Sequence, residues 1–256
     1  MEYTDILYEK KDGIAKVTIN REDKFNAFRA RTWNEMQDAF ISAGRDPEVG
    51  VVILTGAGKK AFCTGGDVSA RTDTGYDDFF DMPGPGYRLR TIPKVTIAMV
   101  NGYAIGGGHV IQAAADLTIA SENARFGQAG PKFGSYDAGW GSAYLARLVG
   151  QKKAREIWFL CRQYTPHEAL DMGLINWVVP QEKLEEETYK IAREVLSMSP
   201  TALKTLKSSF NADLENIEGI QDLSNIALAQ YYSGAESKEG SAAFLEKRIP
   251  DYSKFR

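Results

Sequence analysis

The stretch that decides the fold is VTIAMVNGYAIGGGHVIQAAA, residues 95–115. It starts with an apolar run typical of a strand, Val95–Val100, passes through a glycine-rich segment ending in Gly106–Gly108, and closes with the apolar run His109–Ala115. If the glycine triplet opens a helix, its free N–H groups and the positive end of the helix dipole form an anion site. A glycine-rich packing turn between sheet and helix would have the same sequence, so this motif alone leaves both interpretations open.

The segments on either side indicate an α/β fold. Apolar runs typical of strands lie at Ile14–Ile19, Val51–Leu54 and Leu117–Ala120, and residues 31–43 carry apolar side chains at helical spacing. This alternation predicts stacked units of two strands and a helix. A second glycine turn, Thr64–Asp67 (TGGD), can bring backbone N–H groups close to a ligand, although a tight turn without function is an equal alternative.

The second half of the chain is predicted to be mostly helical. Thr165–Glu168 has the sequence of a capping box with proline at the first helical position, and Ser199–Pro200 opens another helix. We therefore expect a core over residues 1–195 and a helical region over residues 196–256 that serves oligomerisation or covers the site.

The composition argues against several classes of function. The chain has two histidines and two cysteines in 256 residues, too few and too dispersed for a structural zinc site. A net charge of −3 provides no basic surface for nucleic acid, and no apolar run reaches the ~18 residues that span a bilayer. The glycine clusters lack the spacing of dinucleotide and phosphate loops. We expect a cytoplasmic protein with no metal, no nucleotide redox cofactor, no nucleic-acid partner and no membrane partner.

Four motifs, taken together and in this order, resemble the crotonase (enoyl-CoA hydratase/isomerase) superfamily. They are Asn26–Phe28 (NAF), Ala61–Asp67 (AFCTGGD), Gly102–Gly108 (GYAIGGG) and Phe126–Gln128 (FGQ). The resemblance covers essentially the whole chain. It implies an α/β crotonase ββα-spiral core, a C-terminal helical trimerisation region, an acyl-CoA substrate, and a homotrimer or a dimer of trimers (a homohexamer). It also implies that two backbone N–H groups, those of Gly66 and Gly107, bind the thioester oxygen.

Two glutamates that crotonase-like hydratases use to handle water are missing. The matching positions hold Val110, two residues after the glycine triplet, and Gly130, two residues after Phe126–Gln128. Because no carboxylate pair remains for acid–base work, we expect a reaction other than simple hydration.

The blocks Phe126–Gly141 and Gly150–Trp158 resemble the naphthoate synthases (1,4-dihydroxy-2-naphthoyl-CoA synthases) of menaquinone biosynthesis. Those lyases close a ring of o-succinylbenzoyl-CoA by an intramolecular Claisen (Dieckmann) condensation. The resemblance implies a bound bicarbonate that acts as the base in place of the second glutamate, with Gln128, Gly130 and Trp158 as its binding residues. Glycine leaves room there, and amide and indole N–H groups can hold an oxyanion. The ordinary alternative for Trp158 is a core aromatic on a helix.

The same resemblance implies roles for further residues. The catalytic ones are Ser135, Asp137, Tyr76 and Tyr232, and the substrate-binding ones are Lys24, Ala27, Arg71 and Lys247. Hydroxyls and phenols can donate to a carbonyl or move a proton, and an arginine can pair with a substrate carboxylate. The segment Arg71–Pro85 is expected to be a long loop. For His109 we expect packing or a hydrogen bond rather than catalysis.

Two alternatives stay open. The chain also resembles 2-ketocyclohexanecarboxyl-CoA hydrolase, which opens a ring through the same kind of enolate by a retro-Dieckmann reaction in the degradation of cyclic and aromatic acids. The remote alternative is a non-catalytic crotonase-fold binding module, which would not need both glycines of the N–H pair, Gly66 and Gly107.

Overall fold

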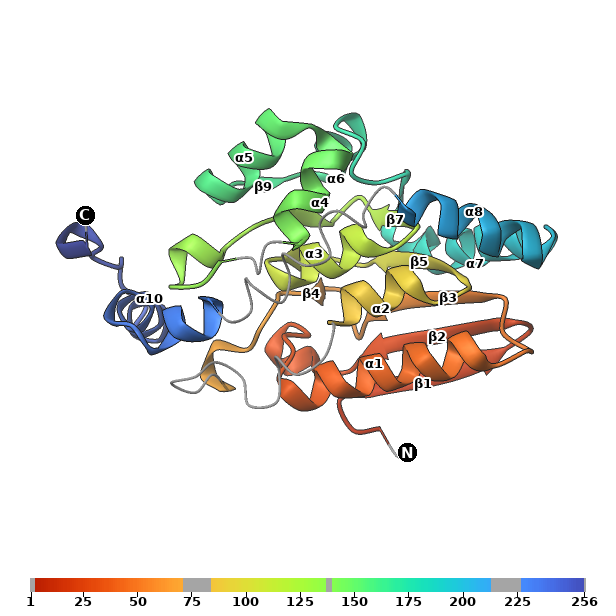
Figure 1. Ribbon diagram of the computed structural model, residues 1–256, viewed down its shortest axis with the longest axis horizontal. Coiled ribbons are helices and arrows are strands. Elements are labelled where there is room, and N and C mark those ends of the chain that lie inside the picture. Colours follow the sequence, from red (N-terminus) through yellow and green to blue (C-terminus); the bar gives the residue numbers. More distant parts are fainter. Residues whose placement is uncertain (1–2, 71–83, 137–139, 213–226, 256) are drawn as a thin grey trace.

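The computed structural model describes residues 3–70, 84–136, 140–212 and 227–255. Two sheets form its centre, and helices cover them (Figure 1). The larger sheet has the order β1-β2-β3-β5-β7-β10, and the smaller has the order β4-β6-β8-β9. Strands β1 and β2 pair antiparallel, as do β8 and β9, and all other pairs are parallel.

The larger sheet is built from the apolar runs that the sequence indicates. Its strands are β1 (Ile6–Lys11), β2 (Ile14–Ile19), β3 (Val51–Gly56), β5 (Val95–Val100), β7 (Leu117–Ser121) and β10 (Trp177–Val179). All six residues of β3 are buried, as expected for a parallel strand covered on both faces. The predictions for β2, β3, β5 and β7 are confirmed, with β3 two residues longer and β7 one residue longer than expected.

The smaller sheet repeats the order of the larger one. Its strands are β4 (Ala61–Cys63), β6 (Tyr103–Ile105), β8 (Arg125–Gly127) and β9 (Gln163–Tyr164). Strands β3, β5 and β7 are each followed in the chain by one strand of the smaller sheet. The successive pairs of strands are therefore added in the same order in both sheets. The prediction of stacked ββα-like units is therefore confirmed.

Helices cover the sheets on both sides. They are α1 (Ala30–Arg45), α2 (Pro85–Thr91), α3 (Gly107–Ala114), α4 (Trp140–Val149), α5 (Gln151–Leu160), α6 (Pro166–Asp171), α7 (Leu184–Leu196), α8 (Pro200–Ala212) and α10 (Ala235–Leu245), and residues 227–233 are also helical. The capping box of α6 is present: Thr165 accepts the N–H of Glu168 at 3.3 Å. Helices α7 and α8 lie at one end of the molecule and α10 at the other (Figure 1). The boundary near residue 195 stays a prediction.

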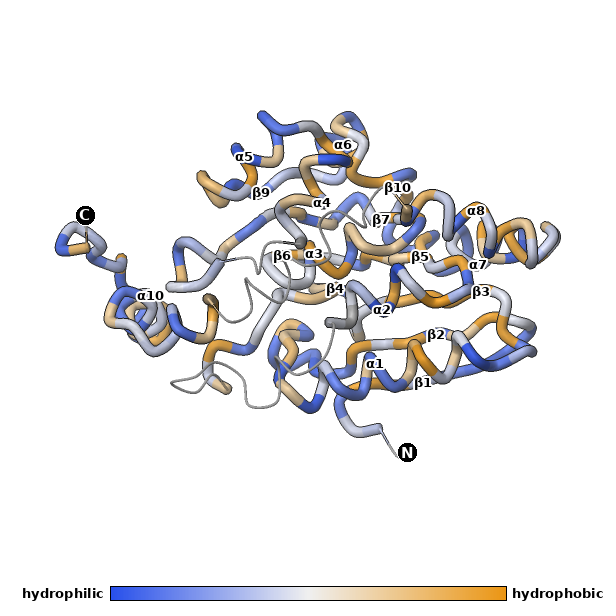
Figure 2. Tube along the Cα trace, in the orientation of Figure 1, coloured by the Kyte–Doolittle hydropathy of each residue, from blue (hydrophilic) through white to orange (hydrophobic). Residues whose placement is uncertain are grey.

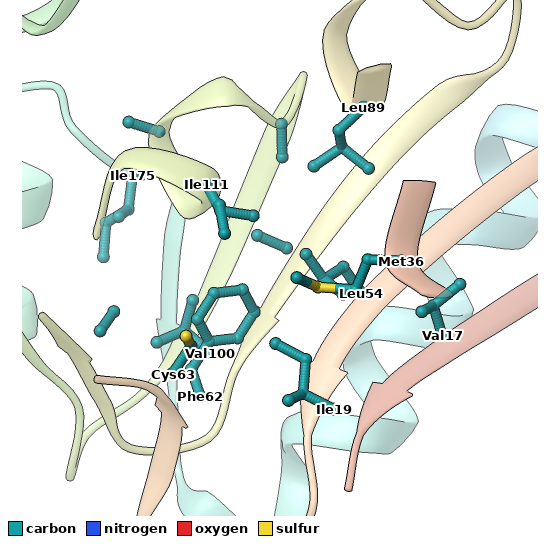
Figure 3. Close-up of a cluster of buried hydrophobic side chains, with 14 of the residues drawn as sticks. Val17, Ile19, Met36, Leu54, Phe62, Cys63, Leu89, Val100, Ile111 and Ile175 are labelled. Atoms are coloured by element: carbon teal, nitrogen blue, oxygen red, sulfur yellow. The ribbon is translucent and has the colours of Figure 1, made fainter. Parts of the chain in front are cut away.

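The main core lies between the larger sheet, helices α1 to α3 and the smaller sheet. Figure 3 shows Phe62 and Cys63 of β4 among Leu54, Val100 and Ile111. On the opposite face of the sheet, a second cluster packs against α7. Hydropathy along the chain follows this pattern, with apolar colour along the central strands and polar colour along the outer side of α1 (Figure 2). Among the described residues, no helix has the length and apolar character needed to cross a membrane.

Glu35 of α1 holds the chain that enters β1. Its buried carboxylate accepts the backbone N–H groups of Thr4, Asp5 and Ile6 at 2.8–3.2 Å. We expect Glu35→Gln to lower the free energy of unfolding by about 1–3 kcal/mol, because an amide cannot accept all these bonds and leaves buried donors unpaired. Urea unfolding measures this. The exposed Glu122→Gln should stay within about 0.5 kcal/mol of the parent, and equal values for both variants would contradict the assignment.

Candidate active site

The first half of the site is the glycine turn that follows β4. Phe28 runs beside it as a single parallel bridge: its N–H donates to the Gly65 oxygen at 2.8 Å, and its oxygen accepts the Asp67 N–H at 2.8 Å. Gly65 has φ +87°, a conformation that favours glycine. These bonds fix the backbone on both sides of Gly66 and leave the Gly66 N–H unused, since no acceptor for it exists among the described residues.

Asn26 aligns Phe28 with that turn. Its backbone adopts a left-handed conformation (φ +56°), which asparagine tolerates better than most residues. Its side-chain amide donates to the oxygens of Ala57 at 3.0 Å and Ala61 at 2.7 Å, and its Oδ1 accepts the Arg21 N–H at 3.1 Å. The motif Asn26–Phe28 therefore connects the segments next to β2, β3 and β4 by hydrogen bonds.

An ion pair between Asp67 and Arg21 stabilises the end of the glycine turn Thr64–Asp67. The Arg21 guanidinium pairs with the Asp67 carboxylate at 2.9 Å and also donates to the Ala27 oxygen. Ser69 donates to the other Asp67 oxygen through its N–H and its hydroxyl. Burial raises the pKa of Asp67, but the bonds from Ser69 and Arg21 outweigh it and hold the pKa below its usual value. The Asp67 carboxylate is thus committed to structure.

The second half of the site is the N-terminus of α3. Gly106 caps the helix with φ +58°, and its N–H donates to the Gly127 oxygen at 3.0 Å. Gly107 is the first helical residue, so its N–H has no partner within the helix, and no described residue accepts it. Of the two interpretations of the glycine triplet, the structure therefore shows the opening of a helix.

The two halves touch through backbone atoms. A Cβ on Gly65 would lie 2.9 Å from the Gly107 nitrogen, and a Cβ on Gly107 would lie 2.6 Å from the Phe28 ring. A Cβ on Gly108 would lie 2.0 Å from the Cys63 oxygen of β4. Glycine is required here for close approach. The result is a pair of backbone N–H groups, those of Gly66 and Gly107, that lie on adjoining turns and have no acceptor among the described residues.

His109 of α3 and Gln128, which follows β8, form a buried polar pair. The Gln128 side-chain nitrogen is 3.0 Å from Nδ1 of His109, and the two side chains are 2% and 1% exposed. Burial lowers the pKa of His109 to about 4, so the imidazole is neutral at pH 7. The hydrogen bond expected for His109 is confirmed. On α5, Trp158 is 9% exposed, and its Nε1 is buried without an acceptor among the described residues.

The expectation that glycine leaves room at position 130 is wrong on the side where a Cβ would point, because backbone fills that side, although Gly130 itself is partly exposed. Its oxygen accepts the Ser135 N–H at 2.9 Å, and a Cβ on Gly130 would lie 2.9 Å from the Ser135 oxygen. A glutamate side chain at this position requires the segment around Ser135 to move. The absence of the second hydratase glutamate is therefore built into the local backbone.

Ser135 and Tyr232, which are 97 residues apart in the chain, meet in space. Their hydroxyl oxygens are 2.8 Å apart, and Tyr232 is buried. A cavity of about 400 Å³ adjoins Ser135. It is lined by Pro131, Ser135, Tyr136, Tyr231, Glu236, Tyr252 and Phe255. The structure thus brings together two of the four residues expected to be catalytic side chains.

The other candidates have different placements. Ala27 is buried beside the first turn, Lys24 is exposed, and Lys247 is exposed just after α10. Arg71, Tyr76 and Asp137 lie outside the described residues. Sequence reasoning missed Arg21, whose only signal is a charged residue two positions after the end of the buried strand β2.

Two stacked sheets built from repeated strand–strand–helix units, with two glycine turns that meet at the N-terminus of α3, define the fold class. The model of the enoyl-CoA hydratase/isomerase family matches residues 9–255, so the chain belongs to that family. It is a crotonase-family acyl-CoA enzyme.

Solved structures agree over nearly the whole chain. An enoyl-CoA hydratase from Mycobacterium avium subsp. paratuberculosis K-10 is 29% identical with a TM-score of 0.90, covering 98% of this chain and 99% of that one. A carnitinyl-CoA hydratase from Mycobacterium avium is 31% identical with a TM-score of 0.86, covering 98% of each chain. A methylmalonyl-CoA decarboxylase in complex with 2-nitronate-propionyl-CoA is 26% identical with a TM-score of 0.86, covering 98% and 99%.

Proposed function

We propose that this enzyme makes a C–C bond in a cyclic acyl-CoA, by ring closure of o-succinylbenzoyl-CoA in the manner of a 1,4-dihydroxy-2-naphthoyl-CoA synthase. The observation that supports the proposal is the pair of backbone N–H groups of Gly66 and Gly107, which have no acceptor among the described residues, together with the absence of glutamate at positions 110 and 130. Val110 stands at one position, and at the other the backbone of Ser135 closes the space beside Gly130. Such a site can hold an enolate but lacks, at these two positions, the carboxylates with which the hydratases add water to a double bond.

The two glycine N–H groups supply the main stabilisation. Loss of a proton from the carbon next to the thioester places negative charge on the thioester oxygen, which Gly66 and Gly107 receive without reorganisation. The enolate carbon then attacks the carbon of the free carboxyl group on the aromatic ring, and loss of water leaves a ring ketone that enolises to the aromatic product. Ser135 and Tyr232, already hydrogen-bonded to each other, are suited to donate to the attacked carbonyl oxygen.

The base is proposed to be a bound bicarbonate. The residues present fit such an anion: Trp158 has a buried indole N–H without an acceptor among the described residues, and the Gln128 amide has one N–H left beyond its bond to His109. When bound, bicarbonate supplies the carboxylate-like base that the side chains do not. Gly130 would contribute its backbone N–H.

The experiment compares three substrates with purified protein, each with and without bicarbonate. We expect o-succinylbenzoyl-CoA to give the naphthoyl product, and the rate to fall when bicarbonate is removed. Opening of 2-ketocyclohexanecarboxyl-CoA alone would replace ring closure with the hydrolase alternative. Hydration of crotonyl-CoA at the highest kcat/KM of the three would overturn C–C chemistry altogether.

Tyr232→Phe removes one hydroxyl of the proposed donor pair. We expect kcat for ring closure to fall by about 10²-fold or more, since a positioned proton donor contributes at least that much. Stability should change little, because the ring and its packing remain. The control is Tyr189→Phe, whose phenol lies on α7 against the far face of the sheet. A Tyr232→Phe enzyme as active as the control would remove Tyr232 from the mechanism.

We also propose assembly into a trimer or a dimer of trimers. Large apolar side chains are exposed on the single chain, among them Phe159 on α5, Phe210 on α8 and Ile249 after α10. Surfaces of this kind support an interface between subunits. Light scattering should give a mass three or six times that of the 28.3 kDa chain. A monomeric mass would contradict this proposal.

A further inference from the structure

His109 and Gln128 come from two segments that the backbone holds in fixed register. Gln128 follows β8, and His109 lies in the first turn of α3. The Gly106 N–H donates to the Gly127 oxygen at 3.0 Å. Gly106 directly precedes α3, and Gly127 directly precedes Gln128. Strands β6 and β8, whose C-terminal ends lie at this bond, pair with each other along their length. The bond between the two side chains is therefore made in a site whose frame is already rigid.

The bond fixes where the imidazole proton resides. Gln128 presents its amide nitrogen, which can only donate, to Nδ1 of His109. Nδ1 must then carry a lone pair, and the single proton of the neutral ring sits on Nε2. Burial favours the neutral ring, as the lowered pKa of His109 indicates. Nε2 itself is buried and has no partner among the described residues.

The bond also fixes the direction of the Gln128 amide. An amide group has an oxygen at one end and two N–H donors at the other. With the neutral Nδ1 as acceptor, the nitrogen end faces α3 and one N–H is consumed there. If an N–H of the histidine faced the amide instead, the oxygen would turn toward it, and the donor needed for an anion would be displaced.

We propose that His109 is a positioning residue for the anion site: its Nδ1 holds the Gln128 amide so that the second amide N–H is kept for a bound carboxylate-like anion. The inference rests on the proposed function, since it assigns the Gln128 donor to the bicarbonate. His109 acts through Gln128. Trp158 Nε1, which the proposed function also assigns to the anion, is a second buried donor without an acceptor among the described residues.

A merely structural role must be separated from this one. The bond could instead matter only as a staple between α3 and β8. Asparagine and leucine at position 109 distinguish the two, because each branches at Cγ and has an atom at the place of Nδ1. Asparagine offers an accepting oxygen there, whereas leucine offers a methyl group. Leucine suits a buried site better than asparagine, so stability alone predicts that His109→Leu is the milder change.

The test measures the affinity for ¹³C-labelled bicarbonate by NMR at pH 7 in the parent protein and in both variants. We expect His109→Asn to bind within about threefold of the parent and His109→Leu to bind at least tenfold more weakly, opposite to the order of stability. Equal weakening in both variants, or unchanged affinity in His109→Leu, would overturn the positioning role. If the parent itself binds no bicarbonate, the proposed base fails and the inference fails with it.

A second measurement reports on the proton directly. The chain has only two histidines, so ¹⁵N-histidine labelling gives two sets of ring signals, and the exposed His167 is identified by His167→Gln. We expect the His109 ring at pH 7 to be the neutral form protonated at Nε2. A ring protonated at Nδ1 would turn the Gln128 oxygen toward it and contradict the assignment, whatever the bicarbonate affinity.

Discussion

Replacement of Gly107 by proline is expected to lower kcat by at least about 10²-fold, in the range reported for the loss of one oxyanion donor (~2.7–4 kcal/mol). Proline has no N–H, so the variant deletes half of the donor pair. A ring carbon also takes the place of the hydrogen and narrows the site. The helix should survive, because Gly107 is the first residue of α3, where proline is favoured.

Gly107→Ala is the matched control. Its Cβ meets the Phe28 ring just as a proline Cβ does, at 2.6 Å, and therefore carries the same steric cost. It keeps the N–H. We expect alanine to lose some activity through the displaced ring but to remain at least tenfold more active than proline. Steady-state rates and thermal unfolding of the two proteins decide this, and equal rates would show that the Gly107 N–H contributes nothing to the reaction.

The second large effect concerns Lys207, which ties α8 to the core. Its side chain is 7% exposed, and its ammonium donates to the oxygens of Leu89 (3.1 Å) and Lys94 (2.8 Å) and to the Asp116 carboxylate (2.7 Å). Burial lowers the pKa of Lys207, and Asp116 opposes that shift. We expect Lys207→Met to reduce the free energy of unfolding by about 3–5 kcal/mol, because it leaves a carboxylate and two carbonyls without their donor.

Lys204 provides the comparison on the same helix. It is exposed, and Lys204→Met should stay within about 0.5 kcal/mol of the parent. Urea unfolding measures both variants. The double variant Lys207→Met with Asp116→Asn should lose less than the sum of the single changes, since the carboxylate left behind by the lysine is neutralised. A Lys207→Met protein as stable as the Lys204→Met protein would show that the buried ammonium is not an anchor.

The sequence predicts the long elements of this fold well and the short ones poorly. Strands such as β3 and β5 are continuous apolar runs, and the start of α6 has its own capping residues, so local sequence is sufficient. Strands β4, β6, β8 and β9 have two or three residues each, too few for a periodic pattern. The sequence of strand β1 has no apolar run that indicates a strand, because only Ile6 of its residues is buried.

The site divides in the same way. The glycine turns are visible in sequence because close backbone approach demands glycine, at Gly65 and at Gly108 alike. The pairing of Ser135 with Tyr232 depends on the approach of the helical segment 227–233 to the loop after β8, which no local spacing encodes, and only the family resemblance suggested both residues. The bond between His109 and Gln128 likewise arises from register between two strands and a helix.

The contact between Gly108 and the Cys63 carbonyl has an evolutionary consequence. Because the donors of the site belong to the main chain, a point mutation cannot delete them except by adding atoms where none fit. Exchange of a neighbouring side chain, at position 110 for example, therefore leaves both main-chain N–H groups in place. If they hold the thioester oxygen as proposed, the reaction can change at the side chains while this support is kept.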